Sequence, residues 1–163
     1  MRSISELIIH CSATPEGKDF TVRQIRQWHL ARGFKDIGYH YVIYRDGSIH
    51  AGRPLEQAGA HCINHNRHSI GICYIGGLAI NGKTPKDTRT GAQKASFTTL
   101  LKELHAKFPH ATLHGHREFV CKRKQSDASI SCAECSREYA GCKFANKACP
   151  SFDCHKDYDY IFK

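Results

Sequence analysis

The hydrophobic positions of this chain form several short apolar runs and one long helical pattern. Apolar runs over residues 6–10, 69–77 and 111–116 are typical of buried strands, and the middle run closes in two glycines. Residues 92–108 instead carry apolar side chains at helical spacing, which predicts an amphipathic helix packed on a sheet. These helical positions are Phe97, Leu100, Leu101, Leu104 and Phe108.

Capping and turn residues place the remaining elements. Thr21 is a suitable N-cap for a helix that ends near Gly33. Asp46-Gly47 lies between two alternating segments and predicts a hairpin turn. This order of elements predicts an α/β fold in which residues 1–163 form a single domain, with a mixed central β-sheet and helices packed over it.

Residues 120–145 differ from the rest because they show little periodicity and many small polar residues. We expect a cysteine-rich inserted loop or subdomain. Three interpretations of its cysteines stay open: a structural four-thiolate zinc site, disulfides formed outside the cell, or free thiols. Only one C-x-x-C pair is present, whereas a zinc ribbon usually has two. The cysteines are Cys121, Cys132, Cys135 and Cys142.

The net charge and the composition limit the classes of binding partner that we expect. The formal net charge of +9 favours an anionic partner, which includes nucleic acid, acidic lipid and cell-wall polymer. No nucleic-acid-binding motif is recognisable, so we expect no specific nucleic acid. No apolar run reaches the length that crosses a bilayer, so we expect no membrane insertion. The N-terminus lacks the features of a secretory signal, which predicts cytoplasmic synthesis without a signal peptide.

Three residues are candidates for a metal site. His10 and His116 end the first and last predicted strands, and Cys149 follows the cysteine-rich segment. Imidazole and thiolate suit zinc, and a catalytic zinc needs three protein ligands and an open position. His114 competes with His116, because strand alternation puts both on the same face. Cys149 is also compatible with a buried thiol or a nucleophile, and Cys154 is a weaker candidate ligand.

The spacing of these three residues is weak evidence by itself, but six sequence segments together resemble a known family. In order, they are "IIHCSAT", "IRQWH", "GYHYVIYRDGSIHAGR", "HSIGICYIGG", "LHGHRE" and "KACPSFD". Together they resemble the zinc-dependent N-acetylmuramoyl-L-alanine amidases of the bacteriophage lysozyme type, a family related to the peptidoglycan recognition proteins. The resemblance covers most of residues 7–119 and 146–153. It implies a peptidoglycan hydrolase that cleaves the amide between N-acetylmuramic acid and L-alanine of the stem peptide.

The resemblance also implies a role for seven residues. The zinc ligands would be His10, His116 and Cys149, and the catalytic residues would be Tyr39 and Lys147. His61 and Asn66 match positions that line the substrate groove in the family, although a structural hydrogen-bonding role explains them equally well. Without the resemblance, we would interpret Tyr39 as an aromatic residue of a strand and Lys147 as a solvated charge on the surface.

Two other functions remain to be separated from this one. A non-catalytic muropeptide-binding module would typically lack a zinc ligand, whereas all three are present here. A zinc peptidase acting on the stem peptide would activate water in the same way and differ only in its substrate pocket. We expect a monomer that acts on cell-wall peptidoglycan after release or export from the cell.

Overall fold

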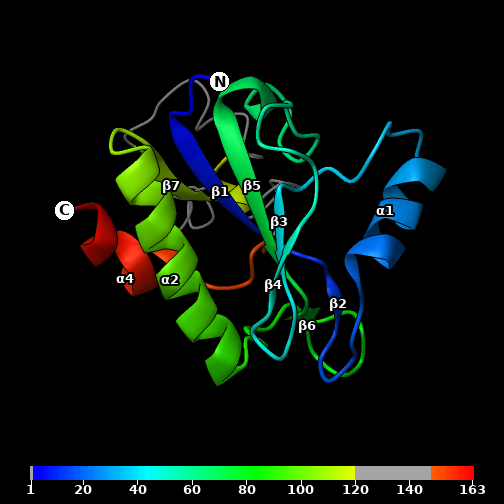
Figure 1. The fold of residues 1–163 in the computed structure, drawn as a ribbon. Coiled ribbons are helices and arrows are strands. Elements are labelled where there is room, and N and C mark those ends of the chain that lie inside the picture. Colours follow the sequence, from blue (N-terminus) through cyan, green and yellow to red (C-terminus); the bar gives the residue numbers. More distant parts are fainter. Residues whose placement is uncertain (1, 120–147) are drawn as a thin grey trace, which may run out of the picture.

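The computed structural model of the chain describes residues 2–119 and 148–163. Its centre is a five-stranded sheet in the order β4-β3-β5-β1-β7 (Figure 1). Strand β4 pairs antiparallel with β3, and the other neighbours are parallel, so the predicted mixed sheet is confirmed. The strands are β1 (Glu6–Cys11), β3 (Tyr41–Ile43), β4 (Ile49–Ala51), β5 (Ser69–Tyr74) and β7 (Thr112–Gly115).

Helices lie on opposite sides of the molecule. Helices α2 and α4 lie together near β7, and α1 lies on the other side (Figure 1). The helices are α1 (Val22–Ala31), α2 (Gly91–Lys107) and α4 (Cys154–Tyr158), with 3-10 turns η1 (Asn66–His68), η2 (His116–Glu118) and η3 (Asp159–Phe162). A second, two-stranded sheet pairs β2 (Thr14–Pro15) with β6 (Gly77–Leu78).

The two faces of β1 have different neighbours, and this difference positions the candidate site. Leu7 and Ile9 belong to the main hydrophobic core, which also contains Phe97 of α2. Because successive side chains of a strand point to opposite faces, His10 points away from that core. Its partner in the parallel register is Cys73 of β5. Core packing on one face therefore presents His10 on the other.

Most predicted elements are confirmed within one or two residues. The long helix spans Gly91–Lys107, and the Asp46-Gly47 turn joins β3 to β4. Thr21 caps α1 through a capping box, in which the side chains of Thr21 and Gln24 each bond the other's backbone N–H. These elements follow from local patterns, so they could be read from the sequence.

The predicted end of the last strand was wrong. The strand was expected to include His116, but β7 ends at Gly115 and His116 begins η2. The alternation that would place His114 and His116 on one face therefore stops before His116. The insertion over 120–145, with its four cysteines, lies outside the described residues, and so does Lys147.

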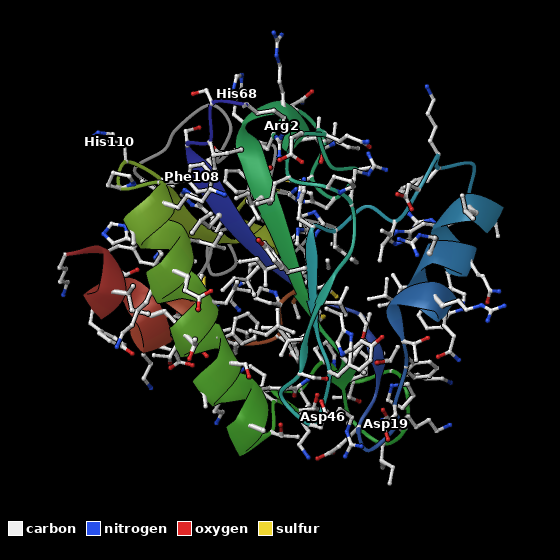
Figure 2. All side chains as sticks on the ribbon, in the orientation of Figure 1. Arg2, Asp19, Asp46, His68, Phe108 and His110 are labelled. Carbon is white, nitrogen blue, oxygen red and sulfur yellow. The ribbon has the colours of Figure 1, made fainter. Side chains whose placement is uncertain are left out.

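Two histidines at the surface are suitable positions for control substitutions. His68 and His110 are exposed and lie at the periphery of the molecule (Figure 2). Among the residues that the structure describes, no helix has the length and apolar character needed to span a bilayer.

Candidate metal centre

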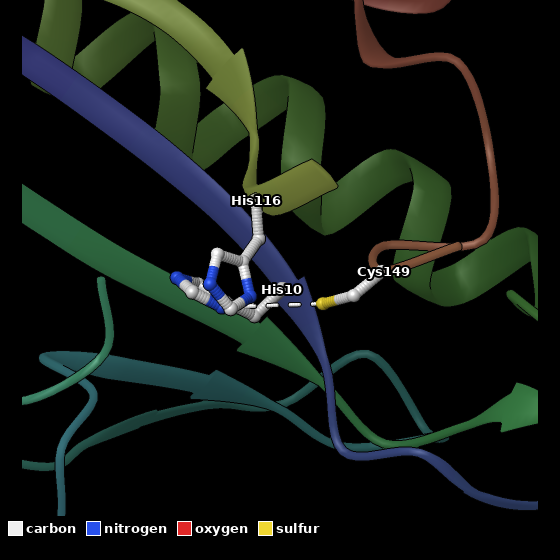
Figure 3. Close-up of side chains that lie close together, drawn as sticks. All are labelled: His10, His116 and Cys149. Atoms are coloured by element: carbon white, nitrogen blue, oxygen red, sulfur yellow. Dashed lines mark hydrogen bonds between the residues drawn. The ribbon is translucent and has the colours of Figure 1, made fainter. Parts of the chain in front are cut away.

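Three side chains from distant parts of the chain converge at one end of the sheet. His10 comes from β1, His116 from the start of η2, and Cys149 from the segment before α4 (Figure 3). Their potential ligand atoms all lie within 4.8 Å of one another. The Sγ of Cys149 is 4.0 Å from Nδ1 of His10, and the rings of His10 and His116 are 4.5 Å apart. This group can hold a metal ion.

Backbone contacts fix Cys149 against the ends of two strands. The N–H of Cys11, at the end of β1, donates to the Sγ of Cys149 at 3.3 Å. The N–H of Arg117 donates to the carbonyl of Cys149 at 2.8 Å. The hydroxyl of Tyr74 donates to the carbonyl of Pro150 at 2.7 Å. The thiol is thus positioned by β1, which carries His10, by η2, which carries His116, and by Tyr74 at the end of β5.

His61 fixes the orientation of the His10 ring. Nε2 of His10 lies 2.9 Å from Nδ1 of His61, and Nε2 of His61 lies 3.1 Å from Oγ of Ser69. With Nε2 engaged in this way, Nδ1 of His10 faces Cys149. A metal-binding histidine commonly bonds a polar group through its other ring nitrogen, which fixes tautomer and direction. His61 occupies that place here.

Two glycines make room for the His61 ring. A Cβ placed on Gly59 would lie 2.5 Å from the His61 ring, and one on Gly71 would lie 2.6 Å from it. Both distances are shorter than side-chain contacts allow, so glycine is required at both positions. Glycine at these two positions therefore leaves the space that the buried imidazole of His61 occupies behind His10.

Burial keeps the His10 and His61 side chains neutral. His10 is 1% exposed, and burial, followed by the nearby His116, lowers its pKa well below the ordinary value. Burial likewise lowers the pKa of His61 well below the ordinary value. The hydrogen bond with the side-chain thiol of Cys11, together with burial, raises the pKa of Cys149 well above that of a free thiol. A thiol in this environment becomes a thiolate only when a cation is beside it.

Tyr39 stands next to the candidate ligand His10. The centroid of its ring is 5.1 Å from that of the His10 ring. Burial raises the pKa of the Tyr39 hydroxyl well above the ordinary value, so the group stays protonated near neutral pH. It can therefore donate a hydrogen bond to an oxygen or nitrogen that reacts at this centre.

Asn66 and His114 contact groups other than the three candidate ligands. Oδ1 of Asn66 accepts from the N–H groups of His61 and Cys62, at 2.8 and 2.9 Å, which is the structural bonding role weighed above. Contact of His61 and Asn66 with substrate stays a prediction. His114 is grouped with Glu118 and His155 and not with His10, because the strand ends between His114 and His116.

Three residues in and around these clusters were not predictable from the sequence. No sequence pattern indicated a role for Ser69, Glu118 or His155. Ser69 opens the motif "SIGICY" and His155 follows "KACPSFD" closely, but neither a contact 51 residues away, such as His10 with His61, nor a short helix leaves a periodic pattern. Only the folded chain brings these groups together.

Known proteins match this chain over most of its length. The family model for N-acetylmuramoyl-L-alanine amidase matches residues 1–129. The endolysin of Escherichia phage T7 is 38% identical over 151 residues, which cover 93% of this chain and 83% of the endolysin. The endolysin of Klebsiella phage KP32 is 36% identical over 149 residues, which cover 91% and 82%.

Solved structures show the same fold. The N-acetylmuramoyl-L-alanine amidase LysC from Clostridium intestinale is 27% identical, with a TM-score of 0.62 over 72% of this chain and 73% of LysC. Wild-type Drosophila PGRP-LB is 29% identical, with a TM-score of 0.61 over 73% and 72%. On the family match and the extent of the endolysin similarity, this chain belongs to the N-acetylmuramoyl-L-alanine amidase family.

Proposed function

We propose that this peptidoglycan hydrolase cleaves the amide between N-acetylmuramic acid and L-alanine with the help of zinc bound to His10, His116 and Cys149. The observation that carries the proposal is the convergence of these three ligand atoms within 4.8 Å, from three separate segments of the chain. Three protein ligands leave one position of a tetrahedral zinc open for water or substrate.

The donor set supports zinc in particular. Two imidazole nitrogens and a thiolate match its borderline softness. Zinc bonds of about 2.0–2.1 Å to nitrogen and 2.3 Å to sulfur put tetrahedral N and S ligands about 3.6 Å apart. The 4.0 Å between Nδ1 of His10 and Sγ of Cys149 needs only a small closure to reach that spacing.

Zinc and the protein would divide the work of amide hydrolysis. A bound zinc supplies a Lewis acid that polarises the carbonyl and lowers the pKa of water toward about 7. Tyr39, protonated and beside His10, would donate a hydrogen bond to the oxyanion or a proton to the leaving nitrogen. Lys147, outside the described residues, is proposed as a cation for the same oxyanion.

The substrate class follows from the relatives and the charge. A mutant of Drosophila PGRP-LB, 29% identical to this chain, was solved in complex with tracheal cytotoxin. The net charge of +9 suits an anionic cell-wall polymer. We infer that the chain acts on the wall as a monomer without binding specific nucleic acid. The complete candidate ligand set favours an enzyme over a muropeptide-binding module.

Mass spectrometry of digested peptidoglycan tests the proposal. The expected products are stem peptides with free L-alanine amino termini and intact glycan chains. New reducing sugar ends would contradict the amidase assignment, and cleavage inside the stem peptide would support the peptidase alternative. His10→Ala should give no products, whereas His68→Ala, a histidine change at the exposed periphery, should digest like the unmodified chain (Figure 2).

A further inference from the structure

A second cluster of metal-ligand side chains lies beside the candidate centre. It joins His114 of β7, Glu118 of η2 and His155 of α4, and their potential ligand atoms lie within 4.8 Å of one another. Oε1 of Glu118 is 3.3 Å from Nδ1 of His114 and 3.0 Å from Nε2 of His155. Two imidazole nitrogens on separate elements therefore point at the same carboxylate oxygen.

The outward atom of each potential ligand has its own partner. Nδ1 of His155 lies 2.8 Å from a carboxylate oxygen of Asp159, and Nε2 of His114 lies 2.8 Å from Oγ1 of Thr112. Oε2 of Glu118 accepts from the N–H of Gly115. Metal-binding histidines typically have their second ring nitrogen bonded to a carboxylate or another oxygen, and metal-binding carboxylates are themselves hydrogen-bonded. All three groups meet that requirement.

We propose that His114, Glu118 and His155 form a second metal site that binds a divalent transition-metal ion of the zinc type. Two imidazoles and a carboxylate are a common zinc donor set. A tetrahedral zinc holds N and O ligands about 3.3 Å apart, close to the two distances to Oε1 of Glu118. The side chains are 25%, 11% and 42% exposed, so an ion can enter from solvent and keep a water ligand.

The position of this site suggests a structural role. His114 and Glu118 stand on either side of His116, and α4 begins at Cys154, shortly after Cys149. An ion bound here would tie together the two segments that deliver His116 and Cys149. Without an ion, the same groups form a cluster of hydrogen bonds and ion pairs that includes Asp159. The number of metal ions bound per chain distinguishes a metal-bound cluster from one held only by hydrogen bonds and ion pairs.

Zinc titration of the chelator-stripped chain tests the site. We expect His155→Ala to bind about one zinc less than the unmodified chain and to remain folded by circular dichroism. His110→Ala, an exposed histidine away from both clusters, should bind as many ions as the unmodified chain (Figure 2). Zinc held elsewhere, including by the other cysteines, is common to all variants and cancels in the difference.

Two further variants make the outcome decisive. Asp159→Asn keeps all three ligands, so it should weaken the affinity of this site by about 10- to 100-fold and leave the other sites unchanged. His10→Ala should lose a different zinc together with activity, and the double variant with His155→Ala should lose two. Equal zinc numbers and affinities for the unmodified chain and His155→Ala would overturn the proposal and leave an ion-pair cluster only. That result would not affect the amidase assignment, which rests on His10→Ala and the digestion products.

Discussion

The two histidine clusters contain similar residues, but His10 in the first and His155 in the second are held in opposite charge states. His10 is 1% exposed, and burial lowers its pKa well below the ordinary value. The His155 side chain is 42% exposed, and its hydrogen bond to Glu118 raises its pKa to about 9. A neutral imidazole is ready to bind a metal, whereas a protonated one must first release its proton. Environment, and not residue type, sets this difference.

The clusters also differ in how they are built. The first rests on the interior strand β1, with His61 and Ser69 behind the candidate ligand His10. The second joins an edge strand to two short helical turns near the end of the chain. Changes in the first should therefore abolish or strongly reduce hydrolysis, and changes in the second should alter metal content or stability.

The largest effect is expected from Cys149→Ala. Loss of the thiolate should remove the zinc, and because the metal supplies several kcal/mol of transition-state stabilisation, activity should fall at least about a thousandfold. Cys154→Ala removes a buried thiol that is not among the candidate ligands, so it should keep both zinc and activity at some cost in stability. Full zinc and full activity in Cys149→Ala would reduce the residue to a buried thiol.

Tyr39→Phe should separate catalysis from metal binding. Removing the hydroxyl deletes a proposed hydrogen-bond donor to the oxyanion, so kcat should fall about a hundredfold while the zinc content stays the same. Zinc content and kcat measured on the same preparation check this outcome. An unchanged kcat would transfer the role to Lys147, whose change to Ala should then lower turnover without loss of zinc.

His61→Ala tests the support behind His10. Because His61 holds the His10 ring, its loss should weaken zinc affinity about 10- to 100-fold. His61→Gln retains an amide that can bond both His10 and Ser69, so it should recover part of the affinity. Unchanged zinc affinity in His61→Ala, combined with a raised KM, would instead support the predicted contact with substrate.

Much of the fold was predictable because one face of the sheet packs on a core. Burial of β1 and β5 gives these strands their continuous apolar runs, and the helical spacing of α2 reflects its packing on the same core. The candidate ligands His10, His116 and Cys149 were predicted only through motifs, since their sequence spacing carries little information. The structure brings these three side chains together, and their role as metal ligands stays a prediction.

The second cluster was not predictable for two physical reasons. Alternation describes a strand only while the strand lasts, and β7 ends at Gly115, so the spacing of His114 and His116 misled. Helix α4 spans only Cys154–Tyr158, which is too short to show helical periodicity. The environment of His155 therefore emerged only from the folded chain.

Gly71→Ala should disturb the first cluster through packing alone. The new Cβ would meet the His61 ring at 2.6 Å, so the ring or the strand must shift, and overpacking of this kind costs about 1–3 kcal/mol. Zinc affinity should fall with stability, because His61 supports His10. Gly91→Ala is a matched control at the start of α2, where a Cβ meets nothing within 4 Å. A harmless Gly71→Ala, by denaturant unfolding and zinc titration, would contradict the tight fit.

The smallest effect concerns pH and the buried His40, which lies behind His61. The N–H of Gly71 donates to Nδ1 of His40 at 3.0 Å, so that nitrogen must stay unprotonated, and burial lowers the pKa of His40 to about 4. A folded pKa below the unfolded value of about 6.5 gives stability that is present above pH 6.5 and is lost as the pH falls toward 4.

Between pH 7 and pH 5.5, His40 alone should therefore reduce the free energy of unfolding by about 1 kcal/mol. His40→Asn keeps an acceptor for the N–H of Gly71 but cannot titrate, so its stability should fall less over the same interval, even if it starts lower at pH 7. Urea unfolding of both proteins at the two pH values measures the difference. Equal losses would mean that His40 does not titrate differently on folding, and that the neutral, buried character of the first cluster does not extend beyond His10 and His61.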